Sequence, residues 1–480
     1  MILVRVGELA RQLGVHRNTI RNWIKRGKLT ARPAPGKGYY VSEQEFVELC
    51  RRYGLDPRRM HLRRVEGEDQ GRQEEGRVGV RAVAVGRRGG ALGLEPQWVD
   101  VCLTCGSCAS ACPLSGVDGL DPRKIVRMVV LGMQEQVVAS SWPWKCTLCG
   151  KCEEACPMDV QIVELMRRAR ALRPREAVPK PMHEGVEMCL ATGNNMGIPT
   201  EDFVMLLRSL GDELASEGLS GFEVPVDRQG ARLMVTVNSK LVFSEPQTLK
   251  LWWKIFYAAG EEWTVPSVNW EGVNWGWFTG DEEATRRIVG RIVRNMKRLG
   301  CKSLLLPECG HAYYATRLGL RKWFAEEARD FEVITMFELL VRYIAEGRIR
   351  LDPSRHPLPA TFHDSCHYGR LSLRTFGHGY FEEGRWIVKQ CCPRFVEMYP
   401  NRSGNYCCGA GGGAWAMSYH AERVFGGRLK ARQIKACGAK VVVTACHNCR
   451  DQISKSLARE YELDVEVKYL WELVAEALVI

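Results

Sequence analysis

The sequence predicts a multidomain protein of α plus α/β class, made of a small helical domain, a helical cysteine-rich module and a duplicated α/β unit. Its 480 residues allow about three domains. Eight of the 20 cysteines lie between Cys102 and Cys156, which marks a separate module. In the second half of the chain, a long helical pattern, a glycine and a buried apolar run occur twice. Strands that alternate with helices in this way are typical of a parallel sheet.

The composition predicts an ordinary globular protein and excludes two classes. Hydrophobic residues make up 45% of the chain and charged residues 26%. No run approaches 18 consecutive apolar residues, so we expect no membrane span. The chain turns polar a few residues after Met1, so we expect no secretory signal and a cytoplasmic location.

Residues 1–50 predict a small helix-turn-helix domain. A short helix at residues 6–13 is followed by a second helix that carries Ile20 and Trp23 on one face. A tight turn and a short strand at residues 36–41 come next, and a further helix follows. This order resembles the winged helix-turn-helix of MerR and excisionase proteins.

That resemblance implies that the second helix enters a major groove of DNA. The residues that would face DNA are Arg17, Asn18, Arg21 and Asn22, with Lys25 on a phosphate. The alternative is a three-helix interaction module that does not bind DNA.

The positive charge of the chain is concentrated near its N-terminus. Residues 1–95 contain 20 Lys and Arg but 11 Asp and Glu, which accounts for nine of the twelve net positive charges. A basic segment of this kind indicates nucleic acid or an acidic partner, and a solvated basic tail is the alternative. Within it, residues 51–95 are rich in Arg, Gly and Glu and predict a flexible linker.

Two copies of the motif CxxCxxCxxxCP predict two [4Fe–4S] clusters in a ferredoxin-like domain at residues 96–175. Thiols in the cytoplasm are kept reduced, so the cysteines do not form a disulfide framework. In this pattern three cysteines of one copy bind one cluster and the fourth binds the other. The predicted ligands are Cys102, Cys105, Cys108 and Cys156 for the first cluster, and Cys146, Cys149, Cys152 and Cys112 for the second. Zinc, which also takes four thiolates, is the alternative. A stretch at residues 122–138 between the two copies predicts a helix.

The remaining chain predicts two related α/β halves, at residues 176–350 and 351–480. Helices at residues 284–299 and 421–435 each precede a glycine, a buried strand and a polar loop. Open α/β sheets place ligands at such strand ends. When the two copies are aligned, Glu308 and His311 occupy the positions of Cys446 and Cys449, so the first half has lost its ligands.

Five cysteines in the second half form a further pattern: Cys366, Cys407, Cys408, Cys446 and Cys449. It resembles the CCG domain of heterodisulfide-reductase-type subunits, in which five cysteines hold a noncubane [4Fe–4S] cluster. The segments 307–311, 407–415, 446–453 and 469–473 resemble the DsrK and HdrD-like members, and the likeness covers residues 96–480. Gly409, Gly411 and Gly412 would let the backbone approach the cluster sulfides and donate N–H groups.

The resemblance implies an electron-transfer subunit with three [4Fe–4S] clusters, two cubane and one noncubane. A membrane haem b and quinone subunit would supply electrons, and a disulfide or trisulfide on a small DsrC-like protein would be reduced. The chain would then be cytoplasmic and peripheral at the inner face of the membrane. One alternative is a soluble Hdr-like subunit with a flavoprotein partner. Another is a redox-sensing regulator that binds DNA through its N-terminal domain.

Side chains that flank the ligand loops are candidates for proton supply: His363, Asp364, His367 and His447. The alternative for each is a hydrogen bond to a cluster ligand. Cys309 has two interpretations, a residue beside the cluster of the second half or a buried packing residue. The other six cysteines lack ligand spacing and predict packing roles: Cys50, Cys189, Cys301, Cys391, Cys392 and Cys437.

Overall fold

The computed structural model describes residues 101–307 and 309–479, together with short stretches between Ile2 and Arg64. The chain divides into two compact units, residues 1–84 and 85–480. Among the described residues, no helix is both long enough and apolar enough to cross a membrane.

The first unit contains a small antiparallel sheet. Its strand order is β2-β3-β1-β4, with β1 at Ile2–Val4, β2 at Ala31–Ala34, β3 at Gly38–Val41 and β4 at Arg63–Arg64. Strand β3 confirms the predicted strand after the tight turn. Strand β4 pairs with Ile2 and Leu3, so the prediction of linker from residue 51 onward is wrong for these two residues. The five predicted DNA-contacting residues, 17, 18, 21, 22 and 25, lie outside the described residues.

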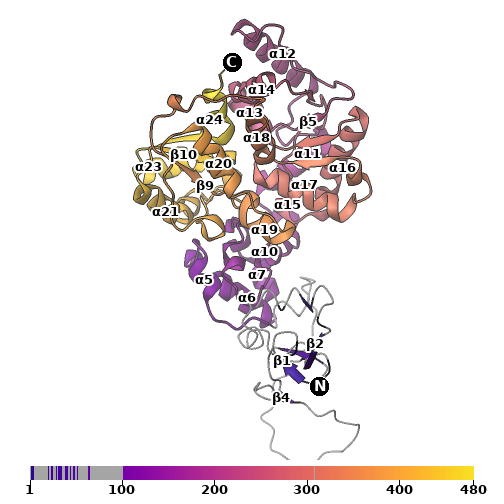
Figure 1. The fold of residues 1–480 in the computed structure, drawn as a ribbon. Coiled ribbons are helices and arrows are strands. Elements are labelled where there is room, and N and C mark those ends of the chain that lie inside the picture. The colour runs from indigo at the N-terminus through magenta and orange to yellow at the C-terminus, as the bar shows by residue number, and fades with distance from the viewer. Residues whose placement is uncertain are drawn as a thin grey trace, which may run out of the picture. The chain divides into compact units, whose positions relative to one another are not determined.

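The second unit begins with a helical module, residues 101–175, drawn in purple in Figure 1. Its α-helices are α5 (Ser107–Ala111), α6 (Pro122–Val130), α7 (Gln134–Ala139), α8 (Trp142–Lys145), α9 (Lys151–Glu154) and α10 (Ile162–Ala171). Helix α6 begins at Pro122, and the Asp121 carboxylate caps it by accepting a hydrogen bond from Lys124 N at 2.9 Å. The predicted single helix at residues 122–138 is wrong: the chain turns at Gly132, whose φ of 78° interrupts it.

The α/β part contains two parallel sheets with the same order of connection. The first half has the order β6-β5-β7-β8, and the second half has β11-β10-β9. Phe395 bridges Ala360 in parallel on the free side of β9, at the edge that β6 occupies in the first sheet. The strands are β5 (Leu233–Val235), β6 (Trp263–Thr264), β7 (Ser303–Leu305) and β8 (Glu332–Ile334), then β9 (Ala360–His363), β10 (Val441–Thr444) and β11 (Glu466–Tyr469).

The two predicted long helices are present as α16 (Glu282–Leu299) and α21 (His420–Cys437). Each ends at a glycine with positive φ, 64° at Gly300 and 69° at Gly438. The other α-helices of the two halves are α11 (Lys180–Thr192), α12 (Thr200–Ser216), α13 (Ser239–Ser244), α14 (Leu249–Ala258), α15 (Trp275–Thr279), α17 (Gly310–Trp323), α18 (Met336–Ala345), α19 (Ser372–Phe376), α20 (Glu382–Cys391), α22 (His447–Asp451), α23 (Ala458–Glu460) and α24 (Leu470–Ala477).

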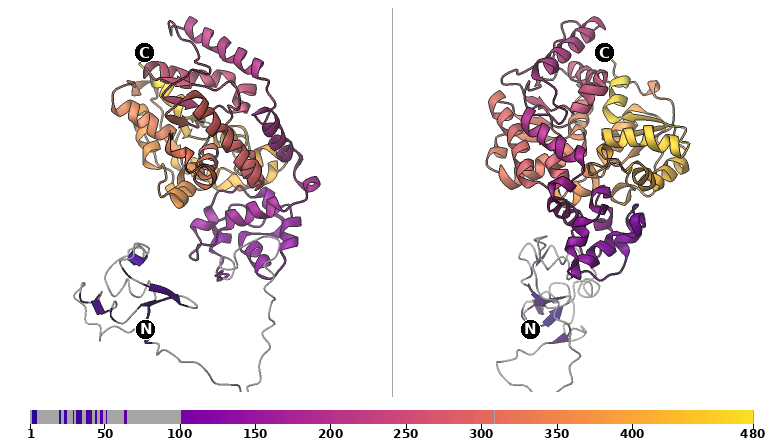
Figure 2. Two further views of the ribbon diagram at one scale, coloured as in Figure 1. Left: turned by 90° about the vertical axis from the view of Figure 1, so that its right-hand side faces the viewer. Right: turned by 180° about the vertical axis from the view of Figure 1, so that it is seen from behind.

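Packing brings the helical module and both halves together. The halves lie side by side, and the helical module lies against one end of both (Figure 2). One apolar core crosses between the halves, where the rings of Trp252 and Trp471 stack with centroids 5.8 Å apart. A second core joins Met166 of the helical module to Trp277 of the first half. The three parts therefore meet around one junction.

Candidate functional site

The eight cysteines of the helical module line two separate cavities. The first cavity, of about 350 Å³, is lined by Cys102, Cys105, Cys108 and Cys156. The second cavity, of about 380 Å³, is lined by Cys112, Cys146, Cys149 and Cys152. The structure thus brings together each of the two sets of four that the motif spacing predicts.

The same turn shapes both cavities. Thr104 and Leu148, which precede the second cysteine of each motif, have φ of 57° and 51°. Gly106 and Gly150, which follow that cysteine, have φ of 85° and 71°. These left-handed residues curl the chain so that nearby thiols lie around one space. Helices α5 and α9 then begin directly after the two glycines.

A third cavity, of about 450 Å³, is lined by all five cysteines of the CCG pattern: Cys366, Cys407, Cys408, Cys446 and Cys449. The sulfurs of Cys408 and Cys449 are 3.3 Å apart. Cys149 also lines this cavity, and its thiol lies within hydrogen-bonding reach of Cys366 and Cys407. The second and third cavities are therefore neighbours that share the wall formed by Cys149.

Parallel strands deliver these cysteines to one edge. Cys366 follows β9, and Cys446 follows β10 as the N-cap residue of α22. The carboxyl ends of parallel strands lie at the same edge of a sheet, so residues that are distant in sequence converge there. The loop that carries Cys407 and Cys408 completes the cavity.

The glycines of that loop permit a close approach between backbones. A Cβ on Gly411 would lie 2.5 Å from the Thr147 carbonyl oxygen, and one on Gly412 would lie 2.7 Å from the Cys146 carbonyl oxygen. Gly409 N donates to Cys407 Sγ at 3.3 Å. The Gly409 N–H thus donates to a cysteine sulfur, whereas Gly411 and Gly412 bring the loop against the helical module.

Arg170 of α10 ties the three parts together. Its Nη1 donates to the Phe278 and Gly412 carbonyl oxygens, both at 2.7 Å, and its Nη2 donates to the Cys146 carbonyl oxygen at 2.7 Å. The side chain is fully buried, and burial lowers the pKa of its guanidinium to about 10. No signal in the sequence distinguishes Arg170 from the other cations of this Arg-rich helix.

Two other buried cations lie near the cysteines that line the third cavity. Arg370 donates from Nη2 to the Asn405 carbonyl oxygen at 2.6 Å, and Lys430 Nζ donates to Asn405 Oδ1. Burial lowers the pKa of Lys430 to about 8. Among the residues described from 101 onward, no carboxylate lies within ion-pair distance of either cation.

The charge of these two cations shows whether an iron–sulfur cluster fits the third cavity, because neither has a carboxylate within ion-pair distance among the residues described from 101 onward. A buried charge is costly unless an opposite charge compensates it. Five thiolates that hold a cluster would supply negative charge beside Arg370 and Lys430. The donor set and its surroundings therefore fit an anionic iron–sulfur cluster in the third cavity.

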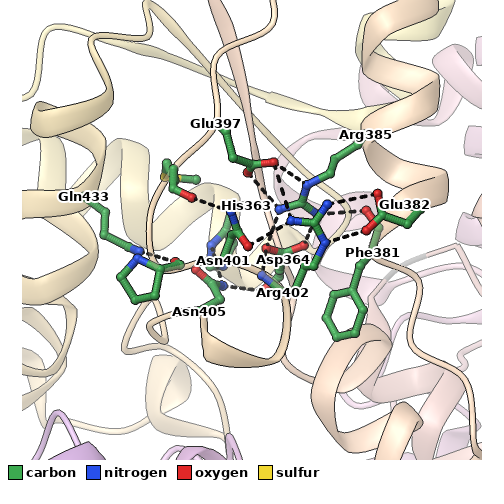
Figure 3. Close-up of polar contacts among 12 residues, drawn as sticks. His363, Asp364, Phe381, Glu382, Arg385, Glu397, Asn401, Arg402, Asn405 and Gln433 are labelled. Carbon is green, nitrogen blue, oxygen red and sulfur yellow. Dashed lines mark hydrogen bonds and ion pairs between the residues drawn. The ribbon is translucent and has the colours of Figure 1, made fainter.

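Asp364 has a structural role in holding the ligand loop (Figure 3). Arg385 donates to both carboxylate oxygens of Asp364, at 2.6 and 3.0 Å, and also to Glu397. The backbone N–H of Arg402 donates to Asp364 Oδ2 at 2.8 Å. These contacts occupy the carboxylate, which favours a positioning role over proton supply.

The three candidate histidines occupy different environments. His363 approaches Asn405 Nδ2 at 3.5 Å through Nδ1, and a ring nitrogen lies within 4.8 Å of the Cys408 and Cys449 sulfurs. His367 lines the third cavity, and its Nε2 has no hydrogen-bond partner. His447 contacts Asn238 of the first half at 3.0 Å through Nδ1.

Burial lowers the pKa of His363 to about 3 and that of His367 to about 4. Both rings are therefore neutral near pH 7. A neutral imidazole holds a hydrogen bond but carries no excess proton to supply. This favours hydrogen bonding to a sulfur for both residues.

Cys309 lies in the third cavity, beside the five cysteines of the second half. It is the N-cap residue of α17, as Cys446 is of α22. Matching the two helix starts therefore pairs Cys309 with Cys446, and the sequence alignment of Glu308 with Cys446 was wrong by one residue. Glu308 itself lies outside the described residues.

Most of the remaining cysteines are buried and line none of the three cavities. Cys189, Cys301, Cys391 and Cys392 are buried, and Cys437 is half-buried. Cys50 lies outside the described residues.

Three families match separate parts of the chain. A 4Fe-4S dicluster domain matches residues 98–160, and the CCG cysteine-rich domain matches residues 360–454. A helix-turn-helix domain matches residues 3–53. The first two matches coincide with the cysteines of the three cavities and support iron–sulfur clusters as the bound groups.

Several relatives are similar to parts of this chain. The chain is 25% identical over 341 residues to the Hdr-like menaquinol oxidoreductase iron-sulfur subunit of Archaeoglobus profundus, covering 62% of this chain and 59% of that protein. It is 29% identical over 199 residues to one subunit of the dihydromethanophenazine:CoB–CoM heterodisulfide reductase of Methanosarcina mazei, covering 41% and 46%. It is 26% identical over 208 residues to the EtfAB:quinone oxidoreductase of Syntrophomonas wolfei, covering 42% and 27%.

The chain thus spans less than two thirds of the length of the relatives that it matches. The dicluster and CCG matches nevertheless cover all the cysteines of the two motif types that line the three cavities. The chain is thus similar to heterodisulfide-reductase-like iron–sulfur subunits, and it matches a 4Fe-4S dicluster domain, a CCG domain and an N-terminal helix-turn-helix domain.

Proposed function

We propose that the chain is the electron-transfer and catalytic subunit of a disulfide reductase. Two cubane [4Fe–4S] clusters are held by the cysteines of the first and second cavities. A noncubane [4Fe–4S] cluster is held by the five cysteines of the third cavity. When bound, the clusters supply one-electron transfer and, in the third cavity, iron that binds a substrate sulfur.

One observation carries this proposal: the three cysteine-lined cavities adjoin in series. Ile162 lines the first and second cavities, and Cys149 lines the second and third. The first cavity lies near the surface, where Cys105 and Leu103 are exposed. An electron that enters at the first cavity would pass through the second cavity to reach the third.

The residues of the third cavity suit sulfur chemistry. Reduction of a disulfide consumes two electrons and two protons and leaves two thiols. His367 Nε2, which is buried and unpartnered, is placed to hold a hydrogen bond to a sulfur in the cavity. The ring of Phe278 and the buried protein around the cavity limit access of water.

The names of the relatives support the class of partner. A menaquinol oxidoreductase subunit and a heterodisulfide reductase subunit are both similar to this chain. We therefore infer a membrane haem b and quinone subunit as electron donor, a small DsrC-like protein as disulfide carrier, and a cytoplasmic location at the inner face of the membrane. A flavoprotein donor is the alternative, since an EtfAB:quinone oxidoreductase is also similar.

An anaerobic count of iron and acid-labile sulfide tests the cluster content. We expect about 12 iron atoms per chain, from three four-iron clusters. The Cys408→Ser variant should lose an oxidised-state EPR signal and the disulfide-dependent oxidation of a reduced viologen dye. Cys391→Ser, a buried cysteine on α20 away from the three cavities, is the matched control. About 8 iron atoms without that signal would contradict the proposal.

The helix-turn-helix match favours a second candidate, a redox-responsive DNA-binding regulator. A regulator should bind a specific DNA fragment with steep salt dependence. Replacing Arg21 and Asn22 with Ala in the full chain should abolish that binding and leave the disulfide assay unchanged. Absence of binding to a genomic fragment library would exclude this candidate.

A further inference from the structure

We propose that the first half retains one iron ligand: Cys309 is a sixth thiolate at the third cavity, bound beside Cys446. This inference rests on the proposed cluster of the third cavity and adds a residue outside the CCG pattern. It assigns the first half, which lacks the five cysteines, a direct part in the metal site.

The position of Cys309 within the fold is the first support. Cys309 and Cys446 both follow a central parallel strand and both cap the helix that comes next. Both backbones are extended there, with φ of −174° and −144°. The two thiols converge on one cavity, and Cys309 lies within hydrogen-bonding reach of Cys446 Sγ.

Tight packing keeps the Cys309 loop at the cavity. A Cβ on Gly310 would lie 2.8 Å from Tyr368 N and 3.1 Å from His367 Cβ. The Tyr368 hydroxyl donates to the Leu306 carbonyl oxygen at 3.2 Å. The loop of the first half is therefore fixed against the segment that carries Cys366.

His311 supplies an independent sign that this wall of the cavity faces a bound polar group. It is 4% exposed and lines the cavity, and its Nδ1 has no hydrogen-bond partner. Its Nε2 is held by the Asn274 carbonyl oxygen at 2.9 Å, and its ring stacks on Phe278 with centroids 3.7 Å apart. A rigid imidazole with an unpartnered buried nitrogen is costly unless something in the cavity pairs with it.

Cys301 provides the contrast within the same half. It is also buried, but its thiol donates to the Leu299 carbonyl oxygen at 3.9 Å within an apolar core, and it is not among the residues that line the three cysteine cavities. Cys301 thus fits a packing role, whereas Cys309 lies among metal-binding thiols.

Spectroscopy of the anaerobic holoprotein tests the inference. Cys309→Ser and Cys309→Ala are compared with wild type and with Cys301→Ala by iron content, EPR of the oxidised state and ⁵⁷Fe Mössbauer spectra. Loss of a thiolate changes the electron density at one iron, so both Cys309 variants should shift the EPR g-values and the isomer shift of one iron site. Cys301→Ala should match wild type. Gly310→Ala, which displaces the loop but keeps the thiol, should produce a similar shift.

The outcomes separate this inference from the proposed function. Spectra of both Cys309 variants that superimpose on wild type would overturn the sixth ligand and leave the five-cysteine site intact. Loss of the third cluster in both variants, with circular dichroism unchanged, would support it. A wild-type protein with only about 8 iron atoms would overturn the proposed function itself, and the inference with it.

Discussion

The two α/β halves share a strand order but differ in what fills the strand ends. In the second half, the loop at Cys407 and Cys408 is followed by glycines and borders a cavity. In the first half, the comparable segment contains Trp277 and Phe278, which pack against His311 with ring centroids 5.2 and 3.7 Å away. The first half lacks the five cysteines, and aromatic side chains occupy the corresponding space, because an unfilled cavity costs stability.

The first half also forms part of the wall of the third cavity, which holds the five cysteines of the second half. Phe278 lines the third cavity, and Arg170 Nη1 donates to the carbonyl oxygens of Phe278 and Gly412, one from each half. A degenerate copy can therefore be retained because it shapes the working site of its neighbour.

The halves also differ in buried charge. Lys430 lies eight residues before the glycine that ends α21, and the residue eight before the glycine that ends α16 is Ile292. Both are buried. A cation thus occurs on the side with the five thiols, and an aliphatic side chain occurs on the side without them.

The largest expected effect comes from breaking the junction between the halves. Arg170→Met should leave buried carbonyl oxygens of Cys146, Phe278 and Gly412 unpaired and lower the free energy of unfolding by about 3–5 kcal/mol. Urea unfolding followed by circular dichroism measures this. Arg168→Met is the control, since Arg168 forms a part-exposed ion pair with Glu164 at 3.0 Å and its loss should cost less than about 1 kcal/mol. Equal losses for the two variants would contradict the role of Arg170.

The buried charge of the second half predicts a pH dependence in the cluster-free protein. The pKa of Lys430 is lowered in the folded state to about 8, below its usual 10.5, so the unfolded chain binds more protons between these values. Burial of the charged Lys430 therefore lowers the free energy of unfolding by its full amount below pH 8. This penalty disappears as the pH rises towards 10.5, so the free energy of unfolding increases by about 3 kcal/mol. Lys430→Met should remove this rise when urea midpoints of the two apoproteins are compared across that range. The same slope in both proteins would assign the effect elsewhere.

A larger side chain in the loop that follows Cys407 and Cys408 should impair the site of the second half. Gly411→Ala places a Cβ 2.5 Å from the Thr147 carbonyl oxygen, so the loop must move away from the helical module. We expect disulfide reduction to fall about 100-fold, which corresponds to about 2.7 kcal/mol, while iron bound in the first two cavities is retained. Gly404→Ala, whose Cβ would meet only Pro400 Cβ at 3.6 Å, should retain activity. Full activity in Gly411→Ala would show that the close approach is unnecessary.

The smallest expected effect is on the reduction potential of the third cluster in the holoprotein. A buried positive charge stabilises the reduced, more negative state of a nearby cluster. Lys430→Met should therefore lower the reduction potential of the third cluster by about 50–100 mV. A redox titration followed by EPR measures the change, and the potentials of the two cubane clusters should move less. An unchanged or higher potential would contradict compensation of Lys430 by the cluster.

Local spacing explains why much of the site was predictable. The structure places the two predicted groups of four cysteines in separate cavities, because the CxxCxxC turn brings three thiols together within a few residues. The long helices α16 and α21 were equally predictable, since a periodic apolar pattern and a terminal glycine are both local signals.

Three predictions that needed more than local signals failed. The turn at Gly132 divides a stretch that reads as one helix, and Arg63–Arg64 joins a sheet through pairing with the start of the chain. The alignment of Glu308 with Cys446 failed because the segment from the start of the strand to the start of the next helix, Ser303 to Gly310 in the first half and Val441 to His447 in the second, is one residue longer in the first half. Loop lengths and long-range strand pairing leave little trace in single-sequence periodicity.

The sequence by itself determined which residues have the chemistry to bind iron, because thiolates at fixed spacing carry that information within short segments. Tertiary structure alone decided that a thiol of the first half lies in the third cavity. The meeting of two parallel sheets places Cys309 beside Cys446, and the same packing buries Arg170, Arg370 and Lys430, which the sequence presents as ordinary cations. Burial and convergence are properties of the packed molecule, since each depends on neighbours that are distant along the chain.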